Sequence, residues 1–369
     1  MPVIDLFAGA GGLSLGAARA GFEVAASVEL DQFAVATHAL NFPNTVHLAS
    51  DVSTLTGEQL FRASGLAPGE LDGLIGGPPC QGFSTMGRRE VNDERNDLFG
   101  HFFRLVSEMR PKFFVAENVP GILNPKYEHI VQTALSHCPE EYQLLEPLIV
   151  KASDYGVATT RKRVFFIGYD RSQTGMTLHH SDFEPKNITQ VNVSDALNGL
   201  PVEIREDWQS EESGWRPYTP ADADTAFLRK AYGAIPPGVG DPNAIERFFE
   251  RGQIWGCMGT RHTPEVIKRF SATLPGAVDK VSKAIRLDPN GFCPTLRAGT
   301  SKEKGSYQAV RPIHPTQPRV ITPREAARLQ GFPDWFIFHS TKWHSFRQIG
   351  NSVPPILAEQ LLRVFAERI

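Results

Sequence analysis

The stretch Asp5-Leu6-Phe7-Ala8-Gly9-Ala10-Gly11-Gly12 follows a short apolar run and leads into a candidate helix, Leu13–Ala20. Glycines allow positive φ angles and let the backbone approach a ligand closely. Glu29 stands 20 residues beyond Gly9, at the end of the next apolar run, where a carboxylate can accept both hydroxyls of a ribose. The spacing departs from GxGxxG. The loop alone is therefore equally compatible with a tight strand-to-helix connection and with a nucleoside-binding site.

Short apolar runs alternate with amphipathic segments through the first half of the chain. Asp31 can cap a helix that runs to about Asn41, and another helix, Leu98–Met109, stops before Pro111. The apolar runs are predicted strands: Val3–Phe7, Val24–Glu29, a run ending near Asp51, Leu71–Ile75, Phe113–Ala116, Leu144–Val150 and Val164–Ile167. This alternation predicts an α/β fold, an open, doubly wound sheet with helices on both faces.

The pattern degrades after about Asp170, which predicts a second, smaller and irregular domain. Prolines and many glycines break this region into loops and short elements: Pro217, Pro220, Pro236 and Pro237. Regularity returns with the helix Pro323–Gln330, which Thr322 caps and which has proline in its first turn. The last segment, Ile356–Phe365, is a predicted helix.

Composition indicates a globular protein, since 41% of the 369 residues are hydrophobic and 21% are charged. No apolar stretch approaches the roughly 20 residues of a membrane helix, and no secretion signal opens the chain. The four cysteines lie far apart and the eleven histidines are scattered, so we expect a cytoplasmic protein without a metal. The cysteines are Cys80, Cys138, Cys257 and Cys293.

Charge is distributed unevenly along a chain whose net charge is −3. A protein that coats nucleic acid is usually more basic. Between Arg286 and Arg319, however, six positively charged residues stand against two negatively charged ones. Charge alone favours a solvated surface loop there, and a local phosphate-binding face is the second interpretation.

A cysteine lies in a stiff turn at the end of a predicted strand, in Gly76-Gly77-Pro78-Pro79-Cys80-Gln81-Gly82. Such surroundings suit an exposed, nucleophilic thiolate better than a buried apolar cysteine. Glu117 follows the strand Phe113–Ala116, 37 residues later, one strand–helix–strand step away. Both side chains should emerge at one sheet edge beside the glycine loop. There a thiolate could attack an electron-poor ring while the acid gives a proton to a ring nitrogen. Glu117 alone could instead cap a helix.

Two arginines precede the strand Val164–Ile167, in Arg161-Lys162-Arg163. Alternate residues of a strand share a face, so these two guanidinium groups should point the same way. Paired guanidinium groups suit a carboxylate, a phosphate or a base oxygen. A charged edge strand that prevents aggregation is about equally compatible with the sequence.

Taken together, these segments closely resemble the cytosine-C5 DNA methyltransferase family of prokaryotic type. The matching segments follow the family's order and span nearly the whole chain: Asp5–Gly12, Gly76–Ser84, Asp93–Asn96, Glu117–Val119, Arg161–Gly168, Arg319–Asp334 and Gly350–Pro355. The resemblance implies a Rossmann-like, AdoMet-dependent catalytic domain over 1–187 plus 346–369. It also implies a target-recognition domain over 188–345 that binds DNA.

The resemblance implies S-adenosylmethionine (AdoMet) as methyl donor and assigns residues to it. Those residues are Phe7, Gly9, Gly11, Gly12, Glu29, Asp51, Pro79, Leu98, Asn351 and Val353. Because Asn351 comes from the far end of the chain, the C-terminal helix should pack onto the first domain. Cys80 would add to C6 of a cytosine while Glu117 protonates N3, Arg163 would hold O2, and Arg161 would support the carboxylate network.

DNA contacts are also implied by the resemblance. In duplex DNA the target base must leave the stack, at a cost of a few kcal/mol. The stretch Gln81–Asn96 corresponds to a mobile lid that closes on DNA, and Thr295-Leu296 resembles the Thr-Leu pair of the recognition domain. Candidate contacts to DNA are Arg88, Arg89, Arg95, Thr295, Arg297, Lys302, Lys304, Arg311 and Arg319.

One departure and several alternatives stay open. Thr159 stands where the family usually has glutamine, which puts the local hydrogen bonding in question. A tRNA methyltransferase of the same family is the nearest alternative, although 151 residues separate Gly168 from Arg319, enough for a DNA-reading domain. A non-catalytic DNA-binding relative and a nicotinamide-dependent oxidoreductase are two further alternatives.

The expected partner is double-stranded DNA, and a cognate restriction endonuclease is a candidate partner. We expect a monomer, without a membrane contact. Since the chain begins at the cofactor strand, we also expect no large regulatory region before it, as in a compact restriction–modification or orphan enzyme.

Overall fold

The computed structural model describes residues 1–79, 97–175, 177–204, 214–220, 225–233, 235–298 and 310–369. Its contacts divide the chain into two compact units. The first, called the sheet unit, comprises Met1–Lys151, Lys162–Lys186 and Ala358–Ile369. The second unit comprises Ala152–Arg161 and Asn187–Leu357. Among the described residues, no helix has both the length and the apolar character needed to cross a membrane.

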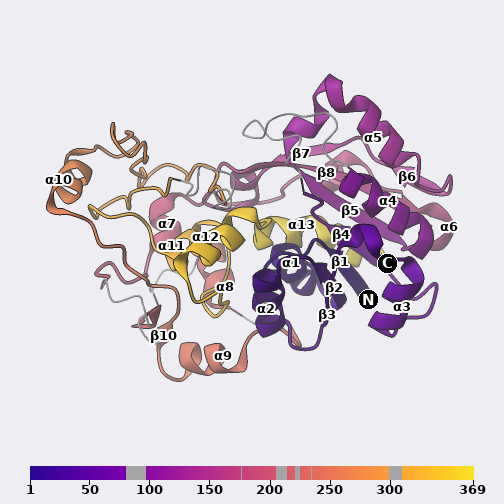
Figure 1. Ribbon diagram of the computed structural model, residues 1–369, viewed down its shortest axis with the longest axis horizontal. Coiled ribbons are helices and arrows are strands. Elements are labelled where there is room, and N and C mark those ends of the chain that lie inside the picture. The colour runs from indigo at the N-terminus through magenta and orange to yellow at the C-terminus, as the bar shows by residue number, and fades with distance from the viewer. Residues whose placement is uncertain (80–96, 176, 205–213, 221–224, 234, 299–309) are drawn as a thin grey trace. The chain divides into compact units, whose positions relative to one another are not determined.

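One sheet of eight strands organises the described part of the sheet unit (Figure 1). The strand order is β3-β2-β1-β4-β5-β8-β6, and β7 also pairs with β8. Strands β1 to β5 run parallel, whereas β8 is antiparallel to its three neighbours. The strands are β1 Pro2–Leu6, β2 Glu23–Glu29, β3 Val46–Ala49, β4 Gly73–Gly76, β5 Phe113–Asn118, β6 Tyr142–Leu144, β7 Leu148–Lys151 and β8 Lys162–Asp170. The mixed α/β class is confirmed.

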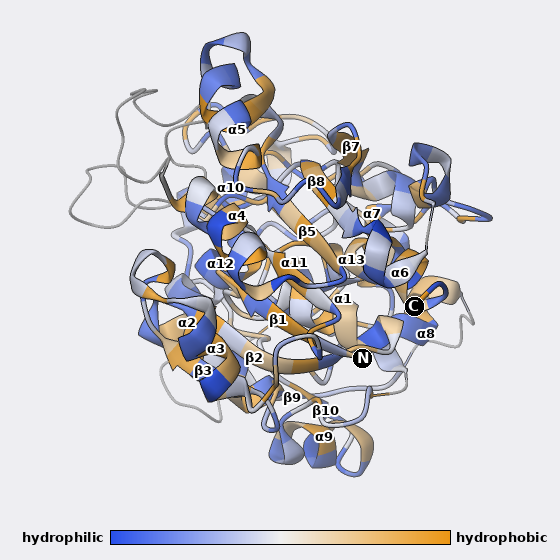
Figure 2. Cartoon of the chain, turned by 90° about the vertical axis from the view of Figure 1, so that its right-hand side faces the viewer, coloured by the Kyte–Doolittle hydropathy of each residue, from blue (hydrophilic) through white to orange (hydrophobic). Residues whose placement is uncertain are grey.

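Helices cover both faces of this sheet, as two adjacent phenylalanines of β5 show. The ring of Phe113 stacks on Phe365 with centroids 4.0 Å apart, whereas Phe114 meets the ring of Phe103 at 5.4 Å. Neighbouring strand residues point to opposite faces, so helices α13 and α4 lie on opposite sides. The helices are α1 Gly12–Ala20, α2 Gln32–Asn41, α3 Gly57–Ser64, α4 Asp97–Met109, α5 Glu128–Leu135, α6 Arg171–Thr174 and α13 Pro355–Ala366. Figure 2 shows hydrophobic colour along β5 and β8.

The C-terminal helix packs onto the sheet unit, which confirms one expectation from the sequence. A Cβ atom added to Gly16 of α1 would come within 2.3 Å of the Ala358 Cβ atom. Glycine is therefore needed at position 16 for α1 and α13 to approach each other this closely.

The predicted strand Leu144–Val150 is wrong, because the chain forms two separate strands there. Strand β6 ends at Leu144 and β7 begins at Leu148, and both pair with β8 at different registers. Pro147 lies in the interruption, and proline has no N–H to donate to a ladder. A largely apolar stretch therefore hides a break in the sheet.

Short elements and buried arginines organise the second unit. Arg324 donates to the Trp255 and Pro333 carbonyl oxygens, both at 2.8 Å, and Arg328 Nε donates to Asp334 Oδ1 at 2.9 Å. The elements are α7 Val193–Leu197, β9 Arg216–Pro217, α8 Ala226–Tyr232, α9 Pro242–Phe249, β10 Gln253–Ile254, α10 Pro264–Ala272, α11 Pro323–Leu329 and α12 Lys342–Asn351. The predicted Thr322 cap of α11 is confirmed, with a complete capping box to Glu325.

Candidate active site

The carboxyl ends of the central strands meet at one edge of the sheet. Leu6 of β1 lies opposite Gly76 of β4, which in turn lies opposite Ala116 of β5. Leu6 also pairs with Val28 of β2. The residues that follow these positions, from the glycine loop to Glu117, therefore emerge side by side. Ligands of open α/β sheets bind beyond this edge.

In the glycine loop, every second residue from Phe7 to Gly11 has a positive φ angle: Phe7 at 59°, Gly9 at 56° and Gly11 at 96°. A Cβ on Gly9 would meet no atom within 4 Å, so Gly9 faces open space. A Cβ on Gly11 would come within 2.4 Å of the Phe42 ring. Gly9 thus leaves room beside the backbone, whereas Gly11 allows packing. Phe7 holds a backbone conformation that is costly for a bulky residue.

Glu29 ties the end of β2 to this loop. Its Oε2 accepts the Gly9 amide hydrogen at 2.9 Å, and its Oε1 accepts those of Leu30 and Asp31, both at 2.8 Å. Burial raises the pKa of Glu29, and these backbone hydrogen bonds partly oppose the rise. The carboxylate is held in one orientation at the edge where the sequence predicts a ribose acceptor.

A buried polar chain lies beneath the loop. The Ser14 hydroxyl donates to Asp5 Oδ2 at 2.6 Å and lies 2.9 Å from His38 Nε2, and His38 Nδ1 lies 2.9 Å from His47 Nε2. Burial raises the pKa of Asp5 to about 7, and the negative charge of Glu29 adds to the rise while the Ser14 hydrogen bond lowers it. Burial also lowers the pKa of His38 well below its usual value. Both groups are therefore held towards their neutral forms.

Glu117 lies at the end of β5, only 8% exposed, and forms an ion pair with Arg163 Nε. Its Oε2 would lie 3.2 Å from a Cβ added to Gly77. The neighbouring Asn118 amide donates to the Pro78 carbonyl oxygen at 3.4 Å. The Glu117 carboxylate therefore lies against the turn that follows β4, at Gly77.

Arg161 has different partners from Arg163. Its guanidinium donates to the Gly350 carbonyl oxygen at 2.8 Å and to the Asn351 carbonyl oxygen at 3.1 Å, and its side chain is buried. The Thr159 hydroxyl accepts the Arg161 amide hydrogen at 3.4 Å. In the second unit, Arg161 thus holds the segment that carries the predicted cofactor residue Asn351.

The remaining described cofactor candidates occupy element ends. Gly12 opens α1, Asp51 Oδ1 accepts the Ser53 amide hydrogen at 2.9 Å just after β3, and Pro79 ends the described part of its turn. Leu98 lies half-buried in the first turn of α4. In the second unit, Asn351 is exposed at the end of α12 and Val353 is buried.

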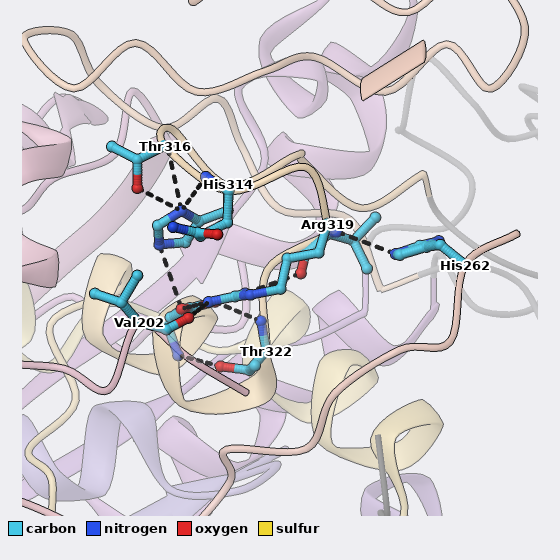
Figure 3. Close-up of polar contacts among 9 residues, drawn as sticks. Val202, His262, His314, Thr316, Arg319 and Thr322 are labelled. Carbon is cyan, nitrogen blue, oxygen red and sulfur yellow. Dashed lines mark hydrogen bonds and ion pairs between the residues drawn. The ribbon is translucent and has the colours of Figure 1, made fainter. Parts of the chain in front are cut away.

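The described candidates for DNA contact fall into two groups. Thr295 and Arg297 are exposed. Arg311 lies 4.1 Å over the Phe346 ring, and burial lowers its pKa to about 10. Arg319 binds both oxygens of Glu325, at 2.7 and 2.9 Å (Figure 3). Arg319 therefore has a carboxylate partner within the protein, whereas Arg297 is open to solvent.

Several predicted site residues lie outside the described residues: Cys80, Arg88, Arg89, Arg95, Lys302 and Lys304, with the stretch Gln81–Asn96. The other three cysteines are described. Burial raises the pKa of the Cys138 and Cys257 thiols to about 12 and raises that of Cys293 as well. None of these three is a thiolate at neutral pH. Among the described residues, no three His, Cys, Asp or Glu side chains gather as metal ligands.

The chain matches one known family from end to end. Residues 1–367 match the family described as C-5 cytosine-specific DNA methylase. The chain belongs to this family. It is therefore a methyltransferase, and methyltransferases of this family generally take their methyl group from AdoMet.

Named relatives of this methylase agree with the assignment. It is 41% identical to Type II methyltransferase M.XorII of Xanthomonas oryzae pv. oryzae, over 96% of this chain and 82% of the relative. It is 33% identical to Type II methyltransferase M.DdeI of Desulfomicrobium norvegicum, over 100% of this chain and 88% of the relative. A crystal structure described as a prophage-encoded DNA modification methyltransferase of E. coli superposes with a TM-score of 0.89, at 51% identity, covering 100% of this chain and 99% of the other.

Sequence reasoning missed two features of this methylase. The first is the row of hydrogen-bonded side chains that runs from Asp5 to His47. Sequence spacing could not predict these contacts, because the residues lie on different elements. The partners of Arg161 lie 189 and 190 residues away, and backbone carbonyl oxygens leave no signal in a sequence. A lone serine in the first turn of α1, Ser14, is the one local sign of a buried polar contact there.

Proposed function

We propose that this methylase transfers a methyl group from AdoMet to C5 of a cytosine in a specific duplex DNA site. The observation that carries the proposal is the position of the Glu117 carboxylate. It lies at the carboxyl edge of the sheet, paired with Arg163 and against Gly77, three residues before Cys80. An acid beside the turn that carries a thiol is what nucleophilic attack on a pyrimidine ring requires.

The glycine loop fits the proposed cofactor. Open space beside Gly9 leaves room for a ligand, and the Glu29 carboxylate is fixed at the adjacent strand end. We propose that Phe7, Gly9, Gly11 and Gly12 line the methionine side, that Glu29 holds the ribose and that Asp51 faces the adenine. Pro79, Leu98, Asn351 and Val353 complete the proposed set. When bound, AdoMet supplies an electrophilic methyl group on a sulfonium.

The proposed chemistry assigns one step to each protein group. The Cys80 thiolate adds to C6 of the cytosine and forms a C–S bond, while Glu117 delivers a proton to N3. Electron density then reaches C5, which takes the methyl group. Loss of the C5 proton, release of the thiolate and return of the N3 proton to Glu117 restore the C5–C6 double bond and the aromatic ring. Arg163, already paired with Glu117, would hold O2 and keep the carboxylate oriented.

The remaining parts of the proposal concern DNA and the cell. The base must leave the duplex to reach the thiol, and we propose that residues 188–345 read the target site. Arg88, Arg89, Arg95, Thr295, Arg297, Lys302, Lys304 and Arg311 are the proposed contacts. The Type II relatives support a restriction–modification role with a cognate endonuclease. The cysteine spacing supports a cytoplasmic location, and we propose that the protein is a monomer.

A trapping experiment tests the mechanism. Duplex DNA carrying 5-fluorocytosine cannot lose a C5 proton, so the protein should form a stable covalent adduct at Cys80 in the presence of AdoMet. Cys80→Ser should abolish both adduct and methyl transfer while AdoMet binding persists. Turnover retained by this variant would contradict the mechanism. The recognition site itself comes from methylation-sensitive sequencing of DNA from cells that express the protein.

A second comparison separates the substrate classes. Tritiated AdoMet should label duplex DNA but not tRNA. Labelled tRNA and unlabelled DNA would assign the methylase to the RNA-directed branch instead.

A further inference from the structure

Four side chains from four elements of the sheet unit form one continuous row beneath the glycine loop, called here the buried row. It begins at Asp5 of β1 and passes through Ser14 of α1 and His38 of α2 to His47 of β3. Ser14 Oγ lies 2.6 Å from Asp5 Oδ2 and 2.9 Å from His38 Nε2, and His38 Nδ1 lies 2.9 Å from His47 Nε2. Every link is within hydrogen-bond distance, so the row is unbroken.

The buried row leads from the interior of the sheet unit to its surface. Asp5 and Ser14 are fully buried and His38 is 1% exposed, whereas His47 is half-buried. His47 is the titratable group that faces His38 from β3. Burial lowers the pKa of His47, and a hydrogen bond at the Thr45 backbone partly opposes the fall. A proton that reaches His47 is therefore given up readily to water.

The inner end of the row is a carboxyl group with one oxygen left unpaired. Among the described residues, Asp5 Oδ1 is buried and accepts no hydrogen bond, although buried carboxyl oxygens usually have a donor. Glu29 of β2 acts on Asp5 with a second negative charge, while β4 places the apolar Ile75 opposite it. An unpaired charge is costly in such surroundings, so Asp5 keeps its proton as long as no cation lies nearby.

The glycine loop packs directly on the row. A Cβ atom added to Gly11 would lie 2.4 Å from the Phe42 ring and 3.1 Å from His38 Cδ2. The His38 ring stacks on the Phe42 ring with centroids 4.3 Å apart, so His38 is held against the loop. A cation bound at the loop would therefore lie close to Asp5, where burial screens its charge only weakly.

The row can carry its hydrogen bonds in either direction, because a hydroxyl and a neutral imidazole each donate and accept. With a proton on Asp5 Oδ2, the carboxyl donates to Ser14, Ser14 donates to His38 Nε2, and His38 Nδ1 donates to His47 Nε2. With Asp5 ionised, each of these hydrogen bonds is reversed. The change moves one proton across each link, so Asp5 loses a proton and His47 gains one, which then passes to water.

We propose that the buried row is a proton relay that removes the proton from Asp5 when the positively charged cofactor binds the glycine loop. The inference rests on the proposed AdoMet site and adds a role for the four side chains of the row. The ionised Asp5 then attracts the methyl donor more strongly than the product, S-adenosylhomocysteine, which lacks the positive charge on sulfur. A row that served only to hold these elements together would let AdoMet bind without any exchange of protons.

Calorimetric titration of the full chain with AdoMet tests the ionisation. Binding enthalpies in phosphate and in Tris, two buffers whose own protonation heats differ, give the number of protons released. Since burial raises the pKa of Asp5 to about 7, the wild type should release about 0.5 proton at pH 7 and about 0.9 proton at pH 6. S-adenosylhomocysteine should cause a smaller release. Asp5→Asn should bind AdoMet without releasing a proton.

Stopped-flow mixing with a pH-indicator dye tests the route of the proton. In the wild type, proton release should coincide with AdoMet binding. His47→Gln keeps a polar side chain at the end of the row but takes up no proton, so release should lag behind binding, and added imidazole should restore the wild-type rate. His137→Gln, which alters an exposed histidine of the sheet unit outside the row, is the matched control and should release its proton as promptly as the wild type.

The outcomes separate the possibilities. AdoMet binding without proton release, or with the same release from Asp5→Asn, overturns the ionisation of Asp5. Equal release with S-adenosylhomocysteine overturns the discrimination between donor and product. Prompt release from His47→Gln overturns the relay. If the wild type itself binds no AdoMet, the proposed function fails rather than the buried row alone.

Discussion

The Glu29 carboxylate, at the end of β2, accepts the amide hydrogen of Gly9 at 2.9 Å. This hydrogen bond ties the end of β2 to the glycine loop that follows the neighbouring strand β1. Three backbone amides occupy this carboxylate, which has about four lone-pair sites. Glu29 is thus oriented before any ligand arrives, and a ribose hydroxyl needs only the remaining lone pair. The loop and the proposed ribose acceptor form one preorganised element.

Glu29→Gln should therefore weaken AdoMet binding by about 10- to 100-fold, since a charge-assisted acceptor becomes a neutral one. Isothermal titration calorimetry gives the affinity directly. Glu23→Gln, at the exposed start of the same strand, should bind AdoMet like the wild type. Equal affinities for Glu29→Gln and the wild type would exclude Glu29 from the cofactor site.

Glu117→Gln should lower kcat by about 100- to 10,000-fold, because general acid catalysis contributes that much. AdoMet affinity should stay the same, since Glu117 is assigned to the base and not to the cofactor. Single-turnover methylation of duplex DNA measures the chemical step. Arg163→Lys keeps a charge beside Glu117 but not the guanidinium geometry, and it should lose less activity than Glu117→Gln. A cofactor-binding defect in Glu117→Gln would contradict this division of roles.

The sequence predicts the strands, helices and caps well where the signal comes from residues close together in the sequence. Asp31 caps α2 by accepting the Phe33 amide hydrogen, and Thr322 caps α11. Glu29 and Glu117 fall at strand ends because an apolar run stops there, and parallel register then brings them to one edge. Leu144–Val150 fails because apolarity does not report which residues can donate to a ladder, and Pro147 cannot.

Contacts between distant residues are what the sequence does not reveal. Nothing near Arg161 indicates that its partners are the carbonyl oxygens of Gly350 and Asn351. The spacing of Arg161 and Arg163 suggests a shared face, yet Arg161 precedes β8 and Arg163 lies within it. A guanidinium finds its acceptors through tertiary packing, which composition and periodicity do not encode.

Arg161→Lys should destabilise the second unit by about 1–3 kcal/mol, because a buried carbonyl oxygen loses its donor. If Asn351 contacts the cofactor, the KM for AdoMet should rise more than kcat falls. Gly350→Ala should act in the same direction, since its Cβ would lie 2.8 Å from the Ala298 backbone nitrogen. Thermal unfolding and steady-state kinetics measure the two effects. Arg62→Lys, on a side chain that is 76% exposed, is the control that should change neither.

Arg297 and Arg319 should respond oppositely to the same substitution. Arg319→Gln breaks a buried pair with Glu325 and should cost about 3–5 kcal/mol of stability. Arg297→Gln should leave the melting temperature unchanged but reduce the salt slope of DNA binding by about one. Differential scanning calorimetry and salt titrations of DNA affinity distinguish them. A stable Arg319→Gln protein with weakened DNA binding would mean that Arg319 is available to DNA after all.

Asp5 should make the stability of the sheet unit depend on pH. Burial raises its pKa in the folded protein to about 7, above the usual value of an aspartate, so the folded state binds the proton more tightly than the unfolded chain. The contribution of Asp5 to stability is then largest below pH 4 and falls as pH rises towards 7, by at most about 4 kcal/mol at 1.36 kcal/mol per pKa unit.

Asp5→Asn removes this titration while its carbonyl oxygen can still accept from Ser14. The free energy of unfolding of the variant minus that of the wild type, from urea titrations at pH 4.5 to 8, should therefore increase with pH. Ser14→Ala removes the hydrogen bond that lowers the Asp5 pKa, so the midpoint of the decline in stability should move to higher pH. The difference between Asp5→Asn and the wild type isolates Asp5 from His38, whose lowered pKa makes stability fall towards acid instead. A difference that stays constant over this range would show that the Asp5 carboxyl does not change its protonation on unfolding.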